Sequence, residues 1–278
     1  MRVFVTGVGG QVGRELQEAF AGHDLTAVDH AALDITDADA TRATISAARP
    51  DAVVHAAAWT AVDACESDPE RAERVNTIGT RNVAAATREI GARVYYLSTD
   101  YVFDGTKPDP YVETDPTNPR SVYGRTKLGG EHEIDDHGAV VRTSWVCGLH
   151  GPNMVKTILR LAGEHDRLTF VDDQRGHPTF ADDLARMIVT LVEGKRTGVC
   201  HVTNQGAVSW YEFARAVLEA AGLDPERVAP IATAELDPPR PAPRPANSVL
   251  DNAALRAAGI PLLPDFHEPL ERLVTELA

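Results

Sequence analysis

Tyr123 and Lys127 stand four positions apart in VYGRTKLGGE (residues 122–131). Residues with this spacing share one face of an α-helix, so the phenol and the ammonium are expected side by side. A tyrosine with a pKa of about 10 is a poor proton donor at neutral pH, but a neighbouring ammonium stabilises the phenolate and lowers that pKa. The pair suits proton transfer. The alternative is a set of exposed polar helix residues, as expected of Arg125, because such spacing often arises by chance.

A third chemical group is expected from LSTDYVFDG (residues 97–105), which continues an apolar run. Ligands of open parallel sheets gather at the carboxyl ends of the strands, where Thr99 and Asp100 would stand. These side chains would alternatively only begin the turn that follows the strand. Thr99 precedes Tyr123 and Lys127 in the chain, so a hydroxyl, a phenol and an ammonium occur in an order that suits one active site.

A glycine-rich stretch, TGVGGQVG, lies between the first apolar run and the first helix-like segment, with Gly7, Gly10 and Gly13 in GxxGxxG spacing. Glycines here allow a tight turn and let backbone amides approach a pyrophosphate. Asp29 ends the next apolar run, where a carboxylate accepts hydrogen bonds from an adenosine ribose; the alternative is an Asp that opens a loop. No arginine directly follows it, which favours NAD(H). Asp34 either caps the next helix or lies near the adenine.

Short apolar runs alternate with helix-like segments through the first half of the chain. The runs are residues 2–6, 25–29, 52–58, 93–99 and 139–145, and the helix-like segments are about 11–21, 37–48, 66–90 and 121–135. Strands that read as continuous apolar runs are buried on both faces, as in parallel sheets covered by helices. The pattern predicts an α/β fold, a Rossmann-type doubly wound parallel sheet with right-handed crossovers.

The second half follows a looser pattern. It predicts helices near 153–164, 180–193, 209–221 and 265–277, and a short strand near 168–171. We therefore expect a dinucleotide-binding Rossmann domain over 1–146 and a smaller substrate-binding domain over 147–278, with some later segments returning to the first. The proline-rich stretch 237–248 excludes regular helix and central strand. It is either a linker or, through its arginines, a clamp for phosphates.

Composition narrows the function classes. The chain has 278 residues, 43% of them hydrophobic, and a formal charge of −14, which disfavours nucleic-acid and anionic membrane partners. No apolar run of about 18 residues occurs. Cys65, Cys147 and Cys200 have neither disulfide nor zinc spacing, and the histidines show no metal spacing. We expect a cytoplasmic protein, and these residues indicate no metal site.

These motifs carry a resemblance. TGVGGQVG, NTIGTRNV, LSTDYVFDG and VYGRTKLGGE are similar to the extended short-chain dehydrogenase/reductase family. HAAAWTAVDACESDP (55–69), RTSWV (142–146), DDQRGHPT (172–179) and RPANS (244–248) resemble the dTDP-4-dehydrorhamnose reductases within it. The similarity covers essentially the whole chain. It implies an NADPH- or NADH-dependent oxidoreductase that reduces the 4-keto group of dTDP-4-dehydro-L-rhamnose to give dTDP-L-rhamnose.

The resemblance also implies residue roles. Tyr123 would protonate the oxygen at sugar C4, Lys127 would lower the tyrosine pKa and hold the nicotinamide ribose, and Thr99 would bond the reacting oxygen. Asp100 and Trp145 would line the sugar pocket. The implied cofactor contacts are Gly10, Gln11 and Val12 at the phosphates, Asp29 at the ribose, Asp34 and Ile35 at the adenine, and Ala58, Trp59 and Thr60 near the nicotinamide ribose.

For the proline-rich stretch, the resemblance favours the phosphate clamp. Arg244, and less strongly Arg240, would bind the diphosphate, because guanidinium groups match phosphate oxygens. Asn247 and Ser248 would add donors. Some relatives are associated with magnesium, but Glu15 and Glu276 are expected on solvated helix faces, so the sequence alone does not support Mg²⁺. A monomer or a homodimer is expected.

Other functions remain open from the residues. A reductase or epimerase of another nucleotide-4-keto deoxysugar would keep the Tyr-Lys pair. A dehydratase would add an Asp-Glu pair beside Thr99, whereas here Asp100 and Tyr101 follow. A non-catalytic regulatory subunit, like the beta subunit of methionine adenosyltransferase, would share the fold. Intact Thr99, Tyr123 and Lys127 favour an enzyme.

Overall fold

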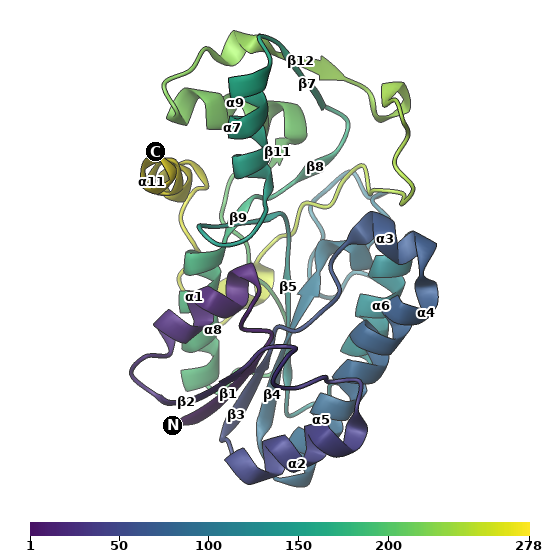
Figure 1. Cartoon of the computed structure of the whole chain (residues 1–278), viewed down its shortest axis with the longest axis vertical. Helices are drawn as coiled ribbons and strands as arrows, with labels where there is room; N and C mark the ends of the chain where they lie inside the picture. Colours follow the sequence, from purple (N-terminus) through teal and green to yellow (C-terminus); the bar gives the residue numbers. More distant parts are fainter.

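The computed structural model describes residues 1–278 and contains a six-stranded parallel sheet with helices on both faces (Figure 1). Its strand order is β10-β5-β4-β3-β1-β2. The strands are β1 Arg2–Thr6, β2 Asp24–Val28, β3 Ala52–His55, β4 Arg93–Thr99, β5 Ala139–Thr143 and β10 Gly198–His201. The predicted Rossmann-type doubly wound sheet is therefore confirmed.

The two faces of β1 show how the sequence builds the layers. Val3 and Val5 pack on one face against α1 (Gln11–Ala19) and α8 (Ala181–Glu193). Phe4 points to the opposite face, which is covered by α2 (Ala38–Ala48) and α5 (Gly79–Glu89). Side chains alternate along a strand, so a run of apolar residues is needed where both faces are covered.

Two strands end earlier than predicted. β3 ends at His55 and not at residue 58, and β5 ends at Thr143 and not at residue 145. Trp145 has a φ of 45°, a left-handed conformation that a strand does not accommodate. The chain turns there, and β6 (Val146–Cys147) begins a separate pairing with β9 (Thr179–Phe180).

The segment 66–90, predicted as one helix, is divided. It contains the end of α3 (Val62–Ser67), then α4 (Pro69–Ala72), a π-helical segment η1 (Glu73–Ile78) and α5. Asp68 has a φ of −139°, and its side chain accepts from the Arg71 amide, so it caps a new helix. The proline after it explains the interruption, because proline disfavours helical backbone in the preceding residue.

The sheet also receives a strand from the second half of the chain. β10 pairs in parallel with β5, and α8 covers the β1 and β5 face beside it. Only four residues long, β10 has too little periodicity to be recognised in the sequence. Residues 181–201 therefore pack with the first half, and the division into two domains at residue 146 stays a prediction.

The rest of the second half forms a smaller body above the sheet in Figure 1. It contains α7 (Met154–Glu164), α9 (Trp210–Ala220) and α11 (His267–Leu277), with β7 (Leu168–Val171) paired to β12 (Val228–Ile231). Phe180, Phe213 and Phe266 lie in its core. Its short elements are β8 Arg175–Gly176, β11 Val208–Ser209 and the 3-10 turns Pro225–Arg227 and Thr233–Glu235, whereas α10 (Ala253–Ala257) packs beside β10 in the core of the sheet.

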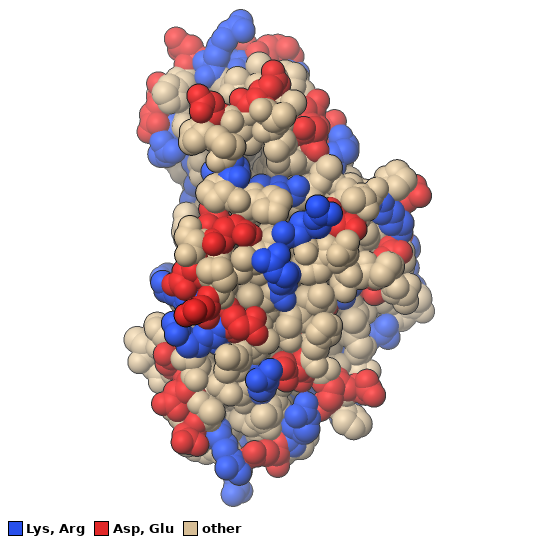
Figure 2. All heavy atoms as spheres, turned by 90° about the vertical axis from the view of Figure 1, so that its right-hand side faces the viewer, with Lys and Arg blue, Asp and Glu red and all other residues tan.

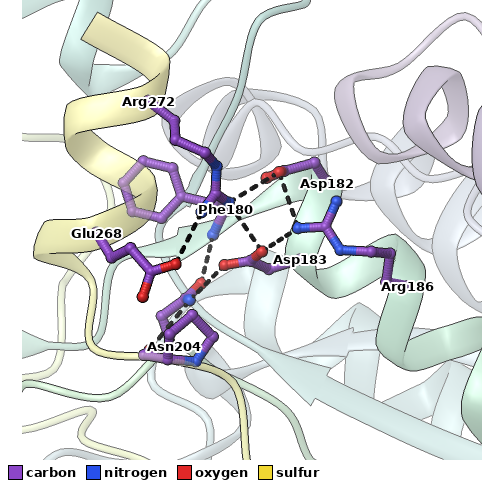
Figure 3. Close-up of polar contacts among 8 residues, drawn as sticks. Phe180, Asp182, Asp183, Arg186, Asn204, Glu268 and Arg272 are labelled. Atoms are coloured by element: carbon purple, nitrogen blue, oxygen red, sulfur yellow. Dashed lines mark hydrogen bonds and ion pairs between the residues drawn. The ribbon is translucent and has the colours of Figure 1, made fainter.

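A cluster of ion pairs attaches α11 to α8 (Figure 3). The Asp183 carboxylate accepts from Arg272 at 3.0 Å, from Asn204 at 2.7 Å, and from Arg186. Asp182 also pairs with both arginines. The Asp183 side chain is only 4% exposed, so removing it would leave both guanidinium groups with only the more exposed Asp182 as a shared partner.

Charges are distributed over the surface without a broad basic area on the face in Figure 2, where acidic and basic side chains alternate. None of the helices is both long enough and apolar enough to cross a lipid bilayer.

Candidate active site

A cavity of about 950 Å³ opens at the carboxyl ends of β1, β3, β4 and β5. The strand ends meet there because all four strands are parallel and adjacent. Most of the predicted site residues line it, namely Gly7, Gly10, Gln11, Val12, Gly13, Asp29, Asp34, Ile35, Ala58, Trp59, Thr60, Thr99, Asp100, Tyr123, Lys127 and Trp145.

The glycine loop makes a close passage between β1 and α1. Gly7 has a φ of 76°, and a Cβ there would lie 2.6 Å from the Ala57 amide nitrogen. A Cβ on Gly13 would lie 2.6 Å from the Val8 Cα. Gly10 caps α1 without any side-chain hydrogen bond. The uncapped helix N-terminus and the bare backbone fit an anionic pyrophosphate.

Acidic residues follow at the far end of the cavity. Asp29 is exposed, and its Oδ1 accepts from the Ala32 amide at 2.9 Å. Asp34 accepts from the Thr36 amide at 2.9 Å, and this bond is the main cause that lowers its pKa. Asp37 caps α2 through the Ala40 amide, so the helix-capping alternative for Asp34 is wrong.

Tyr123 and Lys127 come from α6 (Val122–Glu131), whose first turn is capped by Ser121. The helix approaches η2 (Asp100–Val102) closely: a Cβ on Gly124 would lie 3.0 Å from the Tyr101 carbonyl carbon. Lys127 Nζ donates to the Leu97 carbonyl at 2.6 Å and lies 4.1 Å from the centre of the Tyr96 ring. The lysine is therefore fixed against β4, which the four-residue spacing alone did not indicate.

Burial dominates the electrostatics of this group. Burial raises the pKa of Tyr123, the carboxylate of Asp100 adds to the increase, and a hydrogen bond with Thr99 opposes it. Burial also lowers the pKa of Lys127 to about 7, and Glu131 opposes that change. In this structure Thr99 is the group that lowers the tyrosine pKa, and the predicted effect of Lys127 on it stays a prediction.

Two buried oxygens in the cavity have no hydrogen-bond partner, Asp100 Oδ2 and Thr143 Oγ1. Burial raises the pKa of Asp100 to about 6, although the nearby Ser248 and the Thr99 hydroxyl, which donates to Asp100 Oδ1 at 2.9 Å, oppose the increase. Buried polar atoms are normally paired, so both oxygens fit the polar atoms of a ligand. Sequence reasoning missed Thr143, which ends β5 opposite Thr99 on β4; its place at a strand end was the available signal.

The upper wall of the cavity is aromatic. Trp145 stacks on Trp210 with ring centres 3.6 Å apart and planes 8° apart. A Cβ on Gly176 would lie 2.6 Å from the Trp145 ring, so that glycine leaves space for the indole. Trp210, the first residue of α9, was also missed, although the Ser209 capping box before it marks the start of that helix.

The proline-rich stretch lies outside the lining of this cavity. Arg244 donates to both carboxylate oxygens of Asp63, at 2.7 and 2.8 Å, and Arg240 lies 3.9 Å from the same carboxylate. Asn247 donates to the Lys107 carbonyl at 2.8 Å, and the Ser248 hydroxyl to the Arg175 carbonyl at 3.2 Å. The structure thus separates this stretch from the predicted catalytic residues, except that Ser248 lies close enough to Asp100 to affect the pKa of that carboxyl.

Glu15 and Glu276 line a different cavity, of about 410 Å³, between α1, α8 and α11. Glu276 is exposed, as expected. The Glu15 side chain is only 11% exposed, because the connection after β6 covers it, and His150 lies 3.8 Å away. The solvated-face expectation for Glu15 is therefore wrong. No group of three or more His, Cys, Asp or Glu side chains in the chain is arranged to hold a metal ion.

Comparison with known proteins agrees with this geometry. The profile of the RmlD substrate binding domain family matches residues 1–278. The dTDP-4-dehydrorhamnose reductase of Streptomyces griseus is 43% identical, over 93% of this chain and 88% of that protein. The dTDP-4-keto-6-deoxy-D-glucose reductase of Streptomyces niveus is 40% identical, over 93% of this chain and 91% of that protein.

Among solved structures, the dTDP-4-dehydrorhamnose reductase of Bacillus anthracis in complex with NADP superposes with a TM-score of 0.94. It is 38% identical, and the match covers 99% of each chain. Sequence and structure agree over the full length, so the chain described here belongs to the RmlD substrate binding domain family, which it shares with the dTDP-4-dehydrorhamnose reductases.

Proposed function

We propose that this chain reduces the 4-keto group of dTDP-4-dehydro-L-rhamnose to give dTDP-L-rhamnose, with NADPH or NADH as the reductant. The observation that carries the proposal is the meeting of Thr99, Tyr123 and Lys127 in one cavity with the glycine loop. Its relatives named dTDP-4-dehydrorhamnose reductase support the choice of substrate.

The residues present fit a dinucleotide. The bare backbone at Gly7 and Gly13 and the uncapped N-terminus of α1 would receive the pyrophosphate, and Asp29 would bind the adenosine ribose. Asp34 and Ile35, which line the same cavity, would contact the adenine, and Ala58, Trp59 and Thr60 the nicotinamide-side ribose. The bound nicotinamide would supply the hydride.

The chain itself handles the proton. Tyr123 donates its phenolic proton to the carbonyl oxygen as charge develops there, and the Thr99 hydroxyl, which donates to Asp100 Oδ1 without substrate, turns to donate a second hydrogen bond to the same oxygen. Burial raises the pKa of Tyr123, so the phenol keeps its proton until negative charge develops on the substrate oxygen. The Lys127 ammonium, fixed on the Leu97 carbonyl, then stabilises the phenolate that remains.

The proposal extends to the second half of the chain. Residues 147–278 would mainly bind the nucleotide-sugar, with Asp100 and Trp145 against the sugar. Arg244, Asn247 and Ser248 would take the diphosphate after Arg244 leaves Asp63. Three free cysteines far apart in the chain support a cytoplasmic location. A monomer or homodimer stays a prediction.

The test is a reduction assay with purified protein, dTDP-4-dehydro-L-rhamnose and either NADPH or NADH, followed by absorbance of the reduced nicotinamide. Oxidation that depends on the sugar is expected. The 40% identity to a dTDP-4-keto-6-deoxy-D-glucose reductase makes that sugar the second substrate to include. Turnover of this sugar alone would move the assignment to another 4-keto deoxysugar, and no oxidation with any sugar or cofactor would support a regulatory subunit.

A further inference from the structure

Three residues of α6 lie in one row toward the sheet: Tyr123, Lys127 and Glu131, each four positions after the last. Side chains with this spacing share a helix face. Consecutive residues at the end of β4 hold the last two members of the row. The Leu97 carbonyl accepts from Lys127 at 2.6 Å, and the Ser98 hydroxyl donates to Glu131 at 2.5 Å.

The buried Glu131 carboxylate accepts hydrogen bonds from Arg142 and Ser98, which packing alone does not explain. Arg142, on β5, donates to both of its carboxylate oxygens, at 2.9 and 2.7 Å. The two side chains are only 6% and 5% exposed. Removing both charges from water costs about as much as their attraction returns, so apolar residues of similar size would stabilise the fold at least as well. The pair is therefore better explained by what its charge does to a neighbour.

We propose that Glu131, oriented by Arg142 and Ser98, is a positioning residue that keeps the Lys127 ammonium charged and fixed against β4 beneath Tyr123. The inference rests on the proposed function, because the ammonium matters to the reaction when the tyrosine gives up its proton.

Electrostatics gives the direction of the effect. Burial lowers the pKa of Lys127 to about 7 even with Glu131 beside it, so any further fall would remove the ammonium near neutral pH. Glu131 is the charged group that opposes this loss. Arg142 neutralises part of the Glu131 charge, so it moderates the effect without abolishing it.

The other titratable groups packed around the row do not take over this role. His55 on β3 and His201 on β10 have their pKa values lowered to about 3, chiefly by burial, so both are neutral near pH 7. Burial raises the pKa of Tyr96 on β4. The remaining titratable or charged groups on elements that contact α6 are Arg93 and Tyr95 on β4, Asp63, Cys65 and Glu66 on α3, Glu70 and Arg71 on α4, Glu73 and Arg74 on η1, and Asp100 and Tyr101 on η2.

Two substitutions separate this role from a structural one. Glu131→Gln removes the negative charge, and Arg142→Gln removes the positive charge but leaves the carboxylate. The alkaline limb of the kcat/KM profile should move down by about one pH unit in Glu131→Gln and should stay or move up in Arg142→Gln. A purely structural pair is broken equally by either change, so an alkaline limb that moves in the same way in both variants would overturn the proposal. An alkaline limb that does not move in Glu131→Gln would overturn it as well.

Glu133→Gln is the matched control. Glu133 follows α6 and pairs with Arg81 on α5 at 2.9 Å, at the surface. The variant should leave the limb where it is in the wild type. If Glu131→Gln does not fold, the double variant Glu131→Gln/Arg142→Gln leaves neither charge buried alone, and its limb should still move down; an unmoved limb would refute the role of Glu131.

A second readout does not depend on turnover. Competitive acetylation of Lys127 by acetic anhydride across a pH series, read by mass spectrometry, reports the protonation of that amine directly. Glu131→Gln should shift the labelling midpoint down, and Glu133→Gln should not. If the wild type shows no reductase activity but the midpoint shifts, the proposed function fails and the effect of Glu131 on Lys127 stands. If the wild type is active but the labelling midpoint does not shift in Glu131→Gln, the proposed function stands and the role of Glu131 fails.

Discussion

The two walls of the cavity are built differently. On the lower wall, Gly13, Thr99, Tyr123 and Lys127 belong to regular helices and strands, and the Leu97 carbonyl fixes Lys127. The upper wall consists of Trp145, which follows β5 and has a left-handed backbone conformation, and Trp210, from the smaller body. Beyond it, Arg244 lies in a proline-rich stretch and is paired with Asp63.

The difference assigns different tasks to the walls. Groups on rigid elements are suited to chemistry, which loses rate when a reacting atom is misplaced by about 1 Å. Groups on loops and on the smaller body can adjust to a ligand, which suits recognition. Changes in the lower wall should therefore affect kcat or cofactor binding, and changes in the upper wall should affect the sugar-nucleotide KM.

The largest effect is expected for Tyr123→Phe. Loss of the general acid should lower kcat by about 10²–10⁴-fold, while the NADPH Kd changes little because the ring and Lys127 stay in place. Stopped-flow absorbance and fluorescence titration measure the two quantities. Tyr211→Phe, whose hydroxyl only meets Arg215 on α9, should be fully active. Comparable loss in both variants would show that the Tyr123 effect is not specific to the site.

Gly13→Ala should come next. Its Cβ would lie 2.6 Å from the Val8 Cα, so the loop must shift, at a cost of about 1–3 kcal/mol. We expect a rise of about tenfold or more in the NADPH Kd, together with a lower Tm. Gly9→Ala is the matched control, since its nearest contact is Asp29 Cβ at 3.8 Å. Equal affinities in the two variants would contradict the close passage as a cofactor site.

The difference between regular elements and loops also explains how well the sequence predicted each wall. β1, β4 and α6 repeat a pattern over a whole element, so Thr99, Tyr123 and Lys127 were placed together correctly. No periodicity marks the pairing of Arg244 with Asp63, because those residues are 181 positions apart. β10 was missed because its strand identity depends on β5 beside it, and Trp210 because its role depends on Trp145.

The region beyond the upper wall is tested first, through Arg244. Arg244→Ala should raise the KM for the sugar-nucleotide by about tenfold, the usual loss for a charged hydrogen bond to phosphate, with kcat nearly unchanged. Asp63→Asn should lower that KM, because the diphosphate no longer competes with a carboxylate for the guanidinium. Arg240→Ala, 60% exposed, should change it less. If Asp63→Asn raises the KM as Arg244→Ala does, the pair is itself part of the binding surface.

The smallest effect is expected where Trp210 supports Trp145. Trp210→Leu keeps an apolar side chain but removes an aromatic stack worth about 0.5–1.5 kcal/mol, which corresponds to a KM increase of roughly two- to tenfold. Trp210→Phe retains an aromatic face and should lie between Leu and the wild type. Steady-state kinetics at saturating NADPH measures the series. The stack joins the smaller body to the end of β5, so a change in kcat without a change in KM would mean that the upper wall positions the reacting oxygen, and the division of tasks between the walls would fail.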